Sequence, residues 1–166
     1  MTYKPRNKTR GPSNSEHFAK MLRSTMEEPA WQALNPTAQA LYPWLKLEWH
    51  GPRYNNNGKI RLSVRQAASR LGVSTNTAAR AFHELQAKGF LVVTETACLG
   101  IAGHATSPAF ELTELALPHV DRAEGRKLYR LWRPGNDLRI IKAAVHNPAG
   151  DRKNKNAVIS LATSRC

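Results

Sequence analysis

Residues 75–88, TNTAARAFHELQAK, carry polar side chains at the spacing of one helical face. The apolar residues of this stretch recur at i, i+3, i+4 and i+7 and predict an amphipathic helix: Ala78, Ala81, Phe82 and Leu85. At 100° per residue, Asn76, Arg80 and His83 point the opposite way. Asparagine can form two hydrogen bonds with an adenine edge, arginine can do the same with a guanine edge, and threonine can bond a base or a phosphate. The chemistry available to this face is hydrogen bonding to nucleic-acid bases and phosphates.

A second, shorter helix must position this face. Ser63 and Gln66 have the spacing of a capping box, and an apolar stripe accompanies it at Val64, Ala67, Ala68 and Leu71. Gly72 stands where a helix can end in a left-handed residue, and Ser74 can cap the next helix. The sequence therefore predicts two helices, 64–71 and 75–88, which cross steeply at a short turn.

The charge of the chain is large and clustered. Its net charge is +13, from 25 Lys and Arg against 12 Asp and Glu in 166 residues. Residues 58–90 hold six Lys and Arg against Glu84 alone, whereas no Lys or Arg occurs between Lys88 and Arg122. Such an excess favours a polyanionic partner, because opposite charge steers association and binding releases counterions. Charge by itself does not separate nucleic acid from anionic lipid.

The sequence argues against membrane, secreted and catalytic proteins. No stretch reaches the roughly 20 consecutive apolar residues of a membrane span, and the first residues lack an apolar signal region. Cys98 and Cys166 lie far apart without a CxxC neighbour, which favours neither a disulfide framework nor a zinc site. The six histidines form no HExxH, and GxxxxGK[ST] and GxSxG motifs are absent. We expect a cytoplasmic protein that is not an enzyme and needs no cofactor or metal.

Other segments predict further helices and strands. Apolar residues at helical spacing follow Ser15 and predict a helix that closes near Met26. Asn35 and Pro36 supply a cap and a first-turn proline for a second helix, which Pro43 should kink or shorten. Alternating or β-branched residues predict strands at 59–62, 89–96 and 108–113.

Basic segments flank these elements. Residues 1–15 have no apolar periodicity and predict a flexible arm whose cations could contact phosphates: Lys4, Arg6, Lys8 and Arg10. Residues 118–166 form a basic, partly flexible C-terminal extension with further candidate phosphate contacts at Arg152, Lys153 and Lys155. The apolar run AVISL near its end is either a flexible end or a strand that adds to a protein partner.

The order of helix, strand, two hinged helices and hairpin resembles that of winged helix-turn-helix DNA-binding proteins. More narrowly, PAWQALNPTAQALY, the block 55–91 and FELT resemble small winged-helix proteins of bacterial prophages and mobile elements. The resemblance covers about residues 17–113. It implies an α+β fold, mostly helical with a small antiparallel hairpin, in a domain that spans residues 16–117.

The resemblance also implies a set of DNA contacts. Arg65 and Gln66 would touch phosphates at the start of the first hinged helix. The base-facing residues, beside the capping Ser74, would be Thr75, Asn76, Thr77, Arg80 and His83. The loop ACLGIAGHATS, where such proteins often carry Lys or Arg, offers only His104, so we expect this loop to pack on protein.

These patterns favour a sequence-specific double-stranded DNA-binding protein, a nucleoid-associated transcriptional regulator that reads the major groove with helix 75–88. Two alternatives stay open at this stage. One is a replication or partition accessory of a phage or plasmid, and the other is an RNA- or protein-interaction module on a winged-helix scaffold. The sequence also leaves open whether the chain binds as a homodimer.

Overall fold

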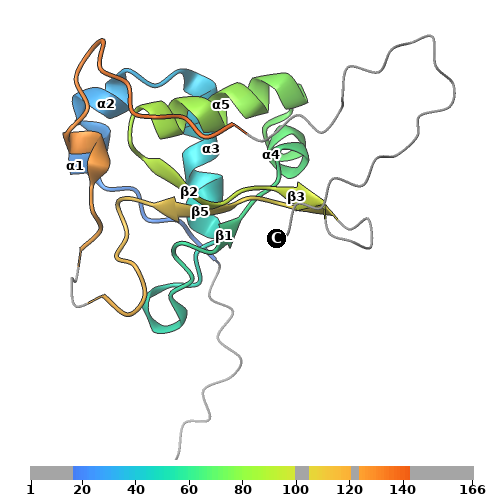
Figure 1. Ribbon diagram of the computed structural model, residues 1–166. Coiled ribbons are helices and arrows are strands. Elements are labelled where there is room, and N and C mark those ends of the chain that lie inside the picture. The colour runs from blue at the N-terminus through green and yellow to red at the C-terminus, as the bar shows by residue number, and fades with distance from the viewer. Residues whose placement is uncertain (1–16, 100–104, 121–123, 143–166) are drawn as a thin grey trace, which may run out of the picture.

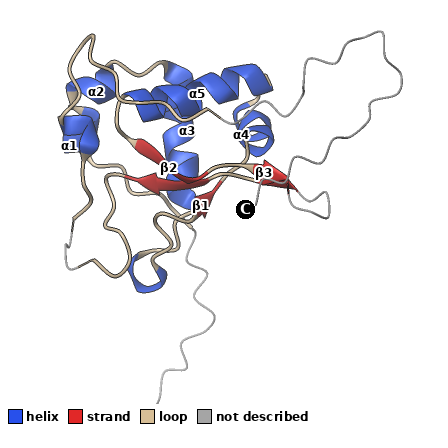
Figure 2. Cartoon of the chain, in the orientation of Figure 1, coloured by secondary structure: helices blue, strands red, loops and turns tan. Residues whose placement is uncertain are grey.

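A computed structural model describes residues 17–99, 105–120 and 124–142 of the chain. The helices are α1 (Arg23–Met26), α2 (Pro29–Gln32), α3 (Pro36–Leu47), α4 (Val64–Leu71) and α5 (Thr75–Ala87), with 3-10 turns η1 (Pro52–Tyr54) and η2 (Leu128–Arg130). The strands are β1 (Ile60–Arg61), β2 (Leu91–Glu95), β3 (Cys98–Leu99), β4 (Ala105–Thr106) and β5 (Ala109–Leu112). The α-helices gather above a small sheet, and η1, the short teal helix at the bottom of Figure 1, lies below it (Figures 1 and 2).

Three helices begin at the caps that the sequence predicts. The Asn35 side chain accepts a hydrogen bond from the backbone N–H three residues on, and α3 starts there. Ser63 Oγ accepts from the backbone N–H of Gln66 at 3.1 Å, while Gln66 Oε1 accepts from the Ser63 N–H at 2.9 Å. Ser74 caps α5 in the same way. Local hydrogen bonding therefore fixes where α3, α4 and α5 start.

The strands form an antiparallel sheet in the order β1-β5-β2. Phe110 in the central strand pairs with Ile60 on one side and Val93 on the other. Beyond a register shift between Val93 and Glu95, β3 and β4 pair as a separate two-stranded hairpin. The mixed helix and strand content confirms the α+β class, and the predicted strand at 59–62 widens the expected hairpin into three strands.

Aromatic side chains fill the space between the helices and the sheet. Trp31, Tyr42 and Phe90 meet edge to face, with ring centroids 5.5–5.6 Å apart. Phe90 also stacks on Tyr129 of η2 at 4.7 Å. Tyr129 and Trp132 are both buried in this same core. The packed chain thus continues past residue 117 and includes η2.

A buried ion pair ties the helices to the end of β5. Lys46 Nζ lies 2.9 Å from Glu114 Oε2, and the two side chains are only 6% and 3% exposed. Tyr42 donates its hydroxyl to the same carboxylate at 2.8 Å, and Thr25 donates to its other oxygen at 3.2 Å. A charge out of water needs such partners, since each unpaired buried ion costs several kcal/mol.

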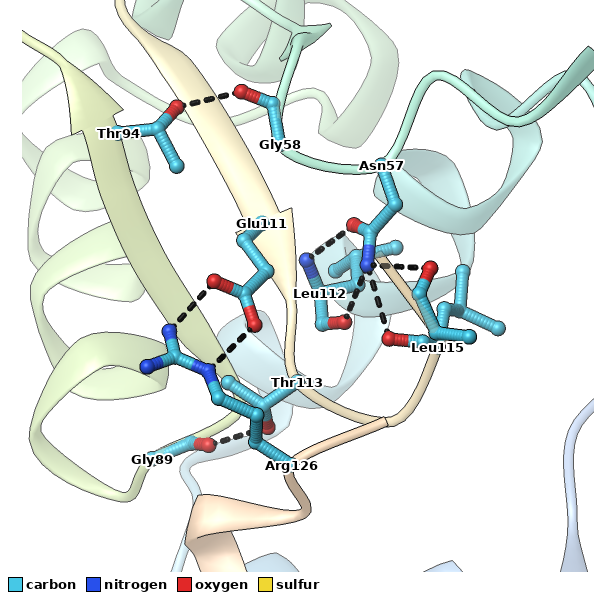
Figure 3. Close-up of polar contacts among 10 residues, drawn as sticks. Asn57, Gly58, Gly89, Thr94, Glu111, Leu112, Thr113, Leu115 and Arg126 are labelled. Atoms are coloured by element: carbon cyan, nitrogen blue, oxygen red, sulfur yellow. Dashed lines mark hydrogen bonds and ion pairs between the residues drawn. The ribbon is translucent and has the colours of Figure 1, made fainter. Parts of the chain in front are cut away.

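A second polar network, drawn in Figure 3, surrounds the end of β5 and the residues that follow it. Asn57, which is 1% exposed, accepts a hydrogen bond from the Leu112 N–H and donates to the carbonyls of Leu112, Leu115 and Ala116. On the other side of the strand, the Arg126 guanidinium forms two bonds with the buried Glu111 carboxylate (Figure 3). The segment after β5 is therefore fastened to the sheet by side chains.

One local prediction was wrong, and a second was wrong in part. The described residues 17–22 are not helical, and α1 starts only at Arg23. Phe18 is 79% exposed, whereas Met21 packs on the core, so only part of the expected apolar face is buried. A short helix that buries so little of its apolar face is unstable. Pro43 was expected to kink or shorten α3. It lies inside the helix and does not shorten it, because α3 packs along α5 and continues to Leu47, whereas the expected kink stays a prediction.

Candidate nucleic-acid interface

Helices α4 and α5 are joined by Gly72, Val73 and Ser74. Gly72 has a φ of +65°, the left-handed conformation that glycine adopts without steric cost. The Val73 N–H donates to the carbonyl of Ala68 at 3.0 Å and closes the end of α4. The turn fixes Thr75 as the first residue of α5 and leaves its first amides free of intrahelical bonds.

The outer face of α5 carries the predicted polar residues. Thr75, Asn76 and Arg80 are exposed in its first two turns, opposite the buried apolar stripe. Thr77 and His83 lie on the same side but are partly buried. The structure thus brings the predicted base-facing set together, with the most accessible members nearest the helix N-terminus.

Some predicted contacts already have hydrogen-bond partners within the chain. The hydroxyls of Ser74 and Thr77 lie 2.9 Å apart and bond to each other, while Ser74 also caps α5. Gln66 uses its side-chain oxygen in the capping box and keeps its amide N–H groups to donate elsewhere. Arg65 is exposed beside it on α4. Ser74, Thr77 and Gln66 therefore shape the helix ends as well as lining the face.

The one carboxylate of α5 is turned away from this face. Glu84 accepts hydrogen bonds from the backbone N–H of Asn35, at 2.8 Å, and from the Asn35 side-chain amide. It thereby lies against the N-terminus of α3, where the helix dipole stabilises negative charge. The outer face of α5 keeps its arginine without the repulsion that an acid there would exert on an anionic ligand.

The cations near α4 and α5 differ in whether they are neutralised. Arg70 is paired with Glu48 at 2.5 Å and lies over the Trp44 ring. Arg65 and Arg80 have no carboxylate within 4.0 Å among the described residues. Their positive charge is therefore available to a polyanion.

The surroundings of His83 favour its neutral form. Burial lowers the pKa of its imidazole from the ordinary value, and the positive charge of Lys142 lowers this pKa further. A neutral ring offers one N–H donor and one acceptor nitrogen. His83 in this form can therefore form polar contacts but adds no charge to the face.

Sequence reasoning missed the segment 138–142, which runs beside α5. The Leu138 N–H donates to the carbonyl of Ala87 at 2.8 Å, and the Ile141 N–H donates to Gln86 Oε1 at 2.9 Å. The sequence LRIIK has no helical or strand period and adopts neither structure. The sequence of this segment carries three apolar residues, Leu138, Ile140 and Ile141. They indicate that the segment packs on the protein, but they do not identify the element on which it packs.

The predicted phosphate contacts of the two flanking segments lie outside the described residues: Lys4, Arg6, Lys8, Arg10, Arg152, Lys153 and Lys155. His104 lies outside them as well, so the expectation that its loop packs on protein stays a prediction. Within the described ranges, no three His, Cys, Asp or Glu side chains gather where a metal ion could be held. None of the helices that the structure describes is long and apolar enough to span a bilayer.

The chain was compared with models of known protein families, with curated proteins and with solved structures, and no match was found in any of the three comparisons.

Proposed function

We propose that this chain is a double-stranded DNA-binding protein that reads base sequence in the major groove with α5. The observation that carries the proposal is the composition of the first two turns of α5: Thr75, Asn76 and Arg80 are exposed there, and Glu84 is held elsewhere by Asn35. Asparagine and arginine are side chains that can bond base edges bidentately. The amides at the N-terminus of α5 that Ser74 does not cap favour a phosphate beside them.

The dimensions of α5 are compatible with this role. An α-helix with its side chains is about 10–12 Å across, and the major groove of B-DNA is about 12 Å wide. Arg65 and Gln66 at the start of α4 would lie at the groove wall and contact phosphates. We further propose that the order α3, β1, α4, α5, β2, hairpin and β5 is that of a winged helix-turn-helix.

The proposed biological role is transcriptional regulation by occupancy of an operator. A two-fold symmetric motif with half-sites about 34 Å apart would indicate a homodimer, and a single asymmetric motif would indicate a monomer. Repeated copies of the motif at a replication origin would instead identify the replication or partition accessory.

Selection of bound sequences from a random duplex library tests the proposal. The full chain is incubated at about 150 mM salt, which suppresses nonspecific phosphate binding, and a single-stranded RNA pool is run in parallel. Enrichment of a duplex motif is expected. If the duplex pool stays unenriched while the RNA pool is enriched, or if neither changes, base reading by α5 is wrong.

A further inference from the structure

The segment after η2 is fastened along the C-terminal half of α5. The chain turns at Arg133 and Asn136, and Asp137 then accepts bonds from Lys88 Nζ at 2.7 Å and Trp132 Nε1 at 2.8 Å. Residues 138–142, here named the strap, follow this anchor. Figure 1 shows the strap, in orange to red, passing across α5 from its C-terminal end towards α4.

Backbone hydrogen bonds and close packing both hold the strap. The bonds from Leu138 to Ala87 and from Ile141 to Gln86 satisfy an end carbonyl of α5 and a side chain that is only 5% exposed. Gly89 has no room for a Cβ, which would lie 2.8 Å from the side chain of Leu138 and from the backbone of η2. The strap is therefore a defined part of the packed body.

The strap also carries positive charge beside α5, and Lys142 brings it to the edge of the α5 face. Arg139 and Lys142 are exposed, and neither has a carboxylate within 4.0 Å among the described residues. Lys142 lies near enough to His83 for its charge to act on that imidazole. Arg80 stands one turn before His83 on the same face. Cations without a carboxylate partner among the described residues therefore lie both on α5, at Arg80, and on the strap, at Arg139 and Lys142.

A strap-covered helix is too wide for the major groove. Two hydrogen-bonded backbones lie about 5 Å apart, so the strap adds at least that width to a helix that already fills a groove of about 12 Å. Only the uncovered first two turns of α5 have the dimensions to enter. The covered half, with the strap, must stay at the level of the phosphates.

We propose that the strap is part of the DNA-binding surface: it confines base reading to the first two turns of α5 and places Arg139 and Lys142 on the phosphates that flank the groove. This inference rests on the proposed function of α5. It assigns His83, which lies beside the strap, to the edge of the interface and leaves base reading to Thr75, Asn76 and Arg80.

The test removes both strap charges in the variant Arg139→Ala/Lys142→Ala. Its control, Lys20→Ala/Arg53→Ala, removes the same charge from exposed residues outside α4, α5 and the strap. Arg53 belongs to η1, which lies below the sheet (Figure 1), and Lys20 lines a pocket together with Pro52 at the start of η1. Binding to the selected motif and to random duplex is titrated from about 50 to 300 mM salt. Losing two phosphate contacts should weaken both duplexes alike, by on the order of 10- to 30-fold near 150 mM salt, and lower the salt slope by about 1.8.

A second readout addresses the confinement of base reading. Repeating the selection should give an unchanged motif for His83→Ala and a changed motif for Asn76→Ala. An altered motif for His83→Ala, or a strap variant that binds no differently from the control, would overturn the inference. Tighter binding by the strap variant would also overturn it, since the strap would then oppose DNA. If the unmodified chain selects no duplex motif, the proposed function itself fails, which distinguishes the two outcomes.

Discussion

Replacing Arg80 by alanine removes an exposed guanidinium from α5 without opening a gap in the core. In the proposed complex this side chain bonds a base edge, so binding to the selected motif should weaken by about 1–3 kcal/mol, with relaxed preference at one position. Random duplex should lose much less. Titration of both duplexes measures the difference, and Arg53→Ala is the matched exposed control. Equal losses on both duplexes would remove Arg80 from the base-reading set.

The buried Tyr42 hydroxyl should make the free energy of unfolding depend on pH. Burial, and then the adjacent Glu114 carboxylate, raise the pKa of Tyr42 well above its ordinary value of 10.0. Because the folded pKa is raised, the stability linked to this group is fully present below about pH 10 and is lost as the pH rises above it. The free energy of unfolding should therefore fall with a slope approaching 1.4 kcal/mol per pH unit from this group alone.

The variant Tyr42→Phe isolates that contribution. At pH 7 it should be less stable by about 1–3 kcal/mol, because Glu114 loses a hydrogen-bond donor. Above pH 10 its stability should fall less steeply than that of the unmodified chain. Urea unfolding at pH 7, 10 and 11 gives the comparison, and the other tyrosines and lysines titrate in both proteins. Parallel curves would mean that Tyr42 ionises as easily in the folded chain as in the unfolded chain.

Two glycines allow the stability cost of a left-handed backbone to be compared with the cost of a steric clash. Gly72 and Gly89 both have positive φ, +65° and +81°, but only Gly89 has neighbours where a Cβ would lie. Gly72→Ala should cost about 1 kcal/mol for the left-handed conformation. Gly89→Ala should cost about 2–4 kcal/mol, because the new methyl also displaces η2 and the strap. Thermal or urea unfolding compares them, and equal losses would contradict the close packing of η2 and the strap on Gly89.

The elements that the sequence predicts well are those with local start and stop signals. Asn35, Ser63, Ser74 and Gly72 act through hydrogen bonds and dihedral angles within a few residues, so helices α3 to α5 follow from the chain alone. The polar outer face of α5 follows from helical periodicity. What could not be predicted depends on distant partners: the strap has no period of its own, and it is ordered by Gln86, Ala87 and Gly89.

For the whole molecule, the charge of +13 predicts that much of the affinity for DNA is independent of base sequence. Removing Lys153 and Lys155 together should weaken binding to the selected motif and to random duplex by similar factors, and should flatten the salt slope by about 1.8. The motif itself should not change. The same salt titration measures this, with Lys20→Ala/Arg53→Ala as the charge-matched control. An unchanged slope would place Lys153 and Lys155 away from the phosphates.

The hydrogen-bond network around Asn57 also protects this residue from deamidation. Asn57 precedes Gly58, the pairing in which the next backbone nitrogen most easily attacks the side-chain amide and converts asparagine to aspartate or isoaspartate. In the folded chain this attack is blocked, because the Gly58 N–H bonds to the Phe110 carbonyl and the Asn57 amide is fixed on both sides (Figure 3). At Asn57, deamidation is therefore expected only while the chain is unfolded. A chain deamidated at Asn57 lacks the amide donors to the carbonyls of Leu112, Leu115 and Ala116, so after prolonged unfolding we expect a fraction of the molecules to refold to a less stable state.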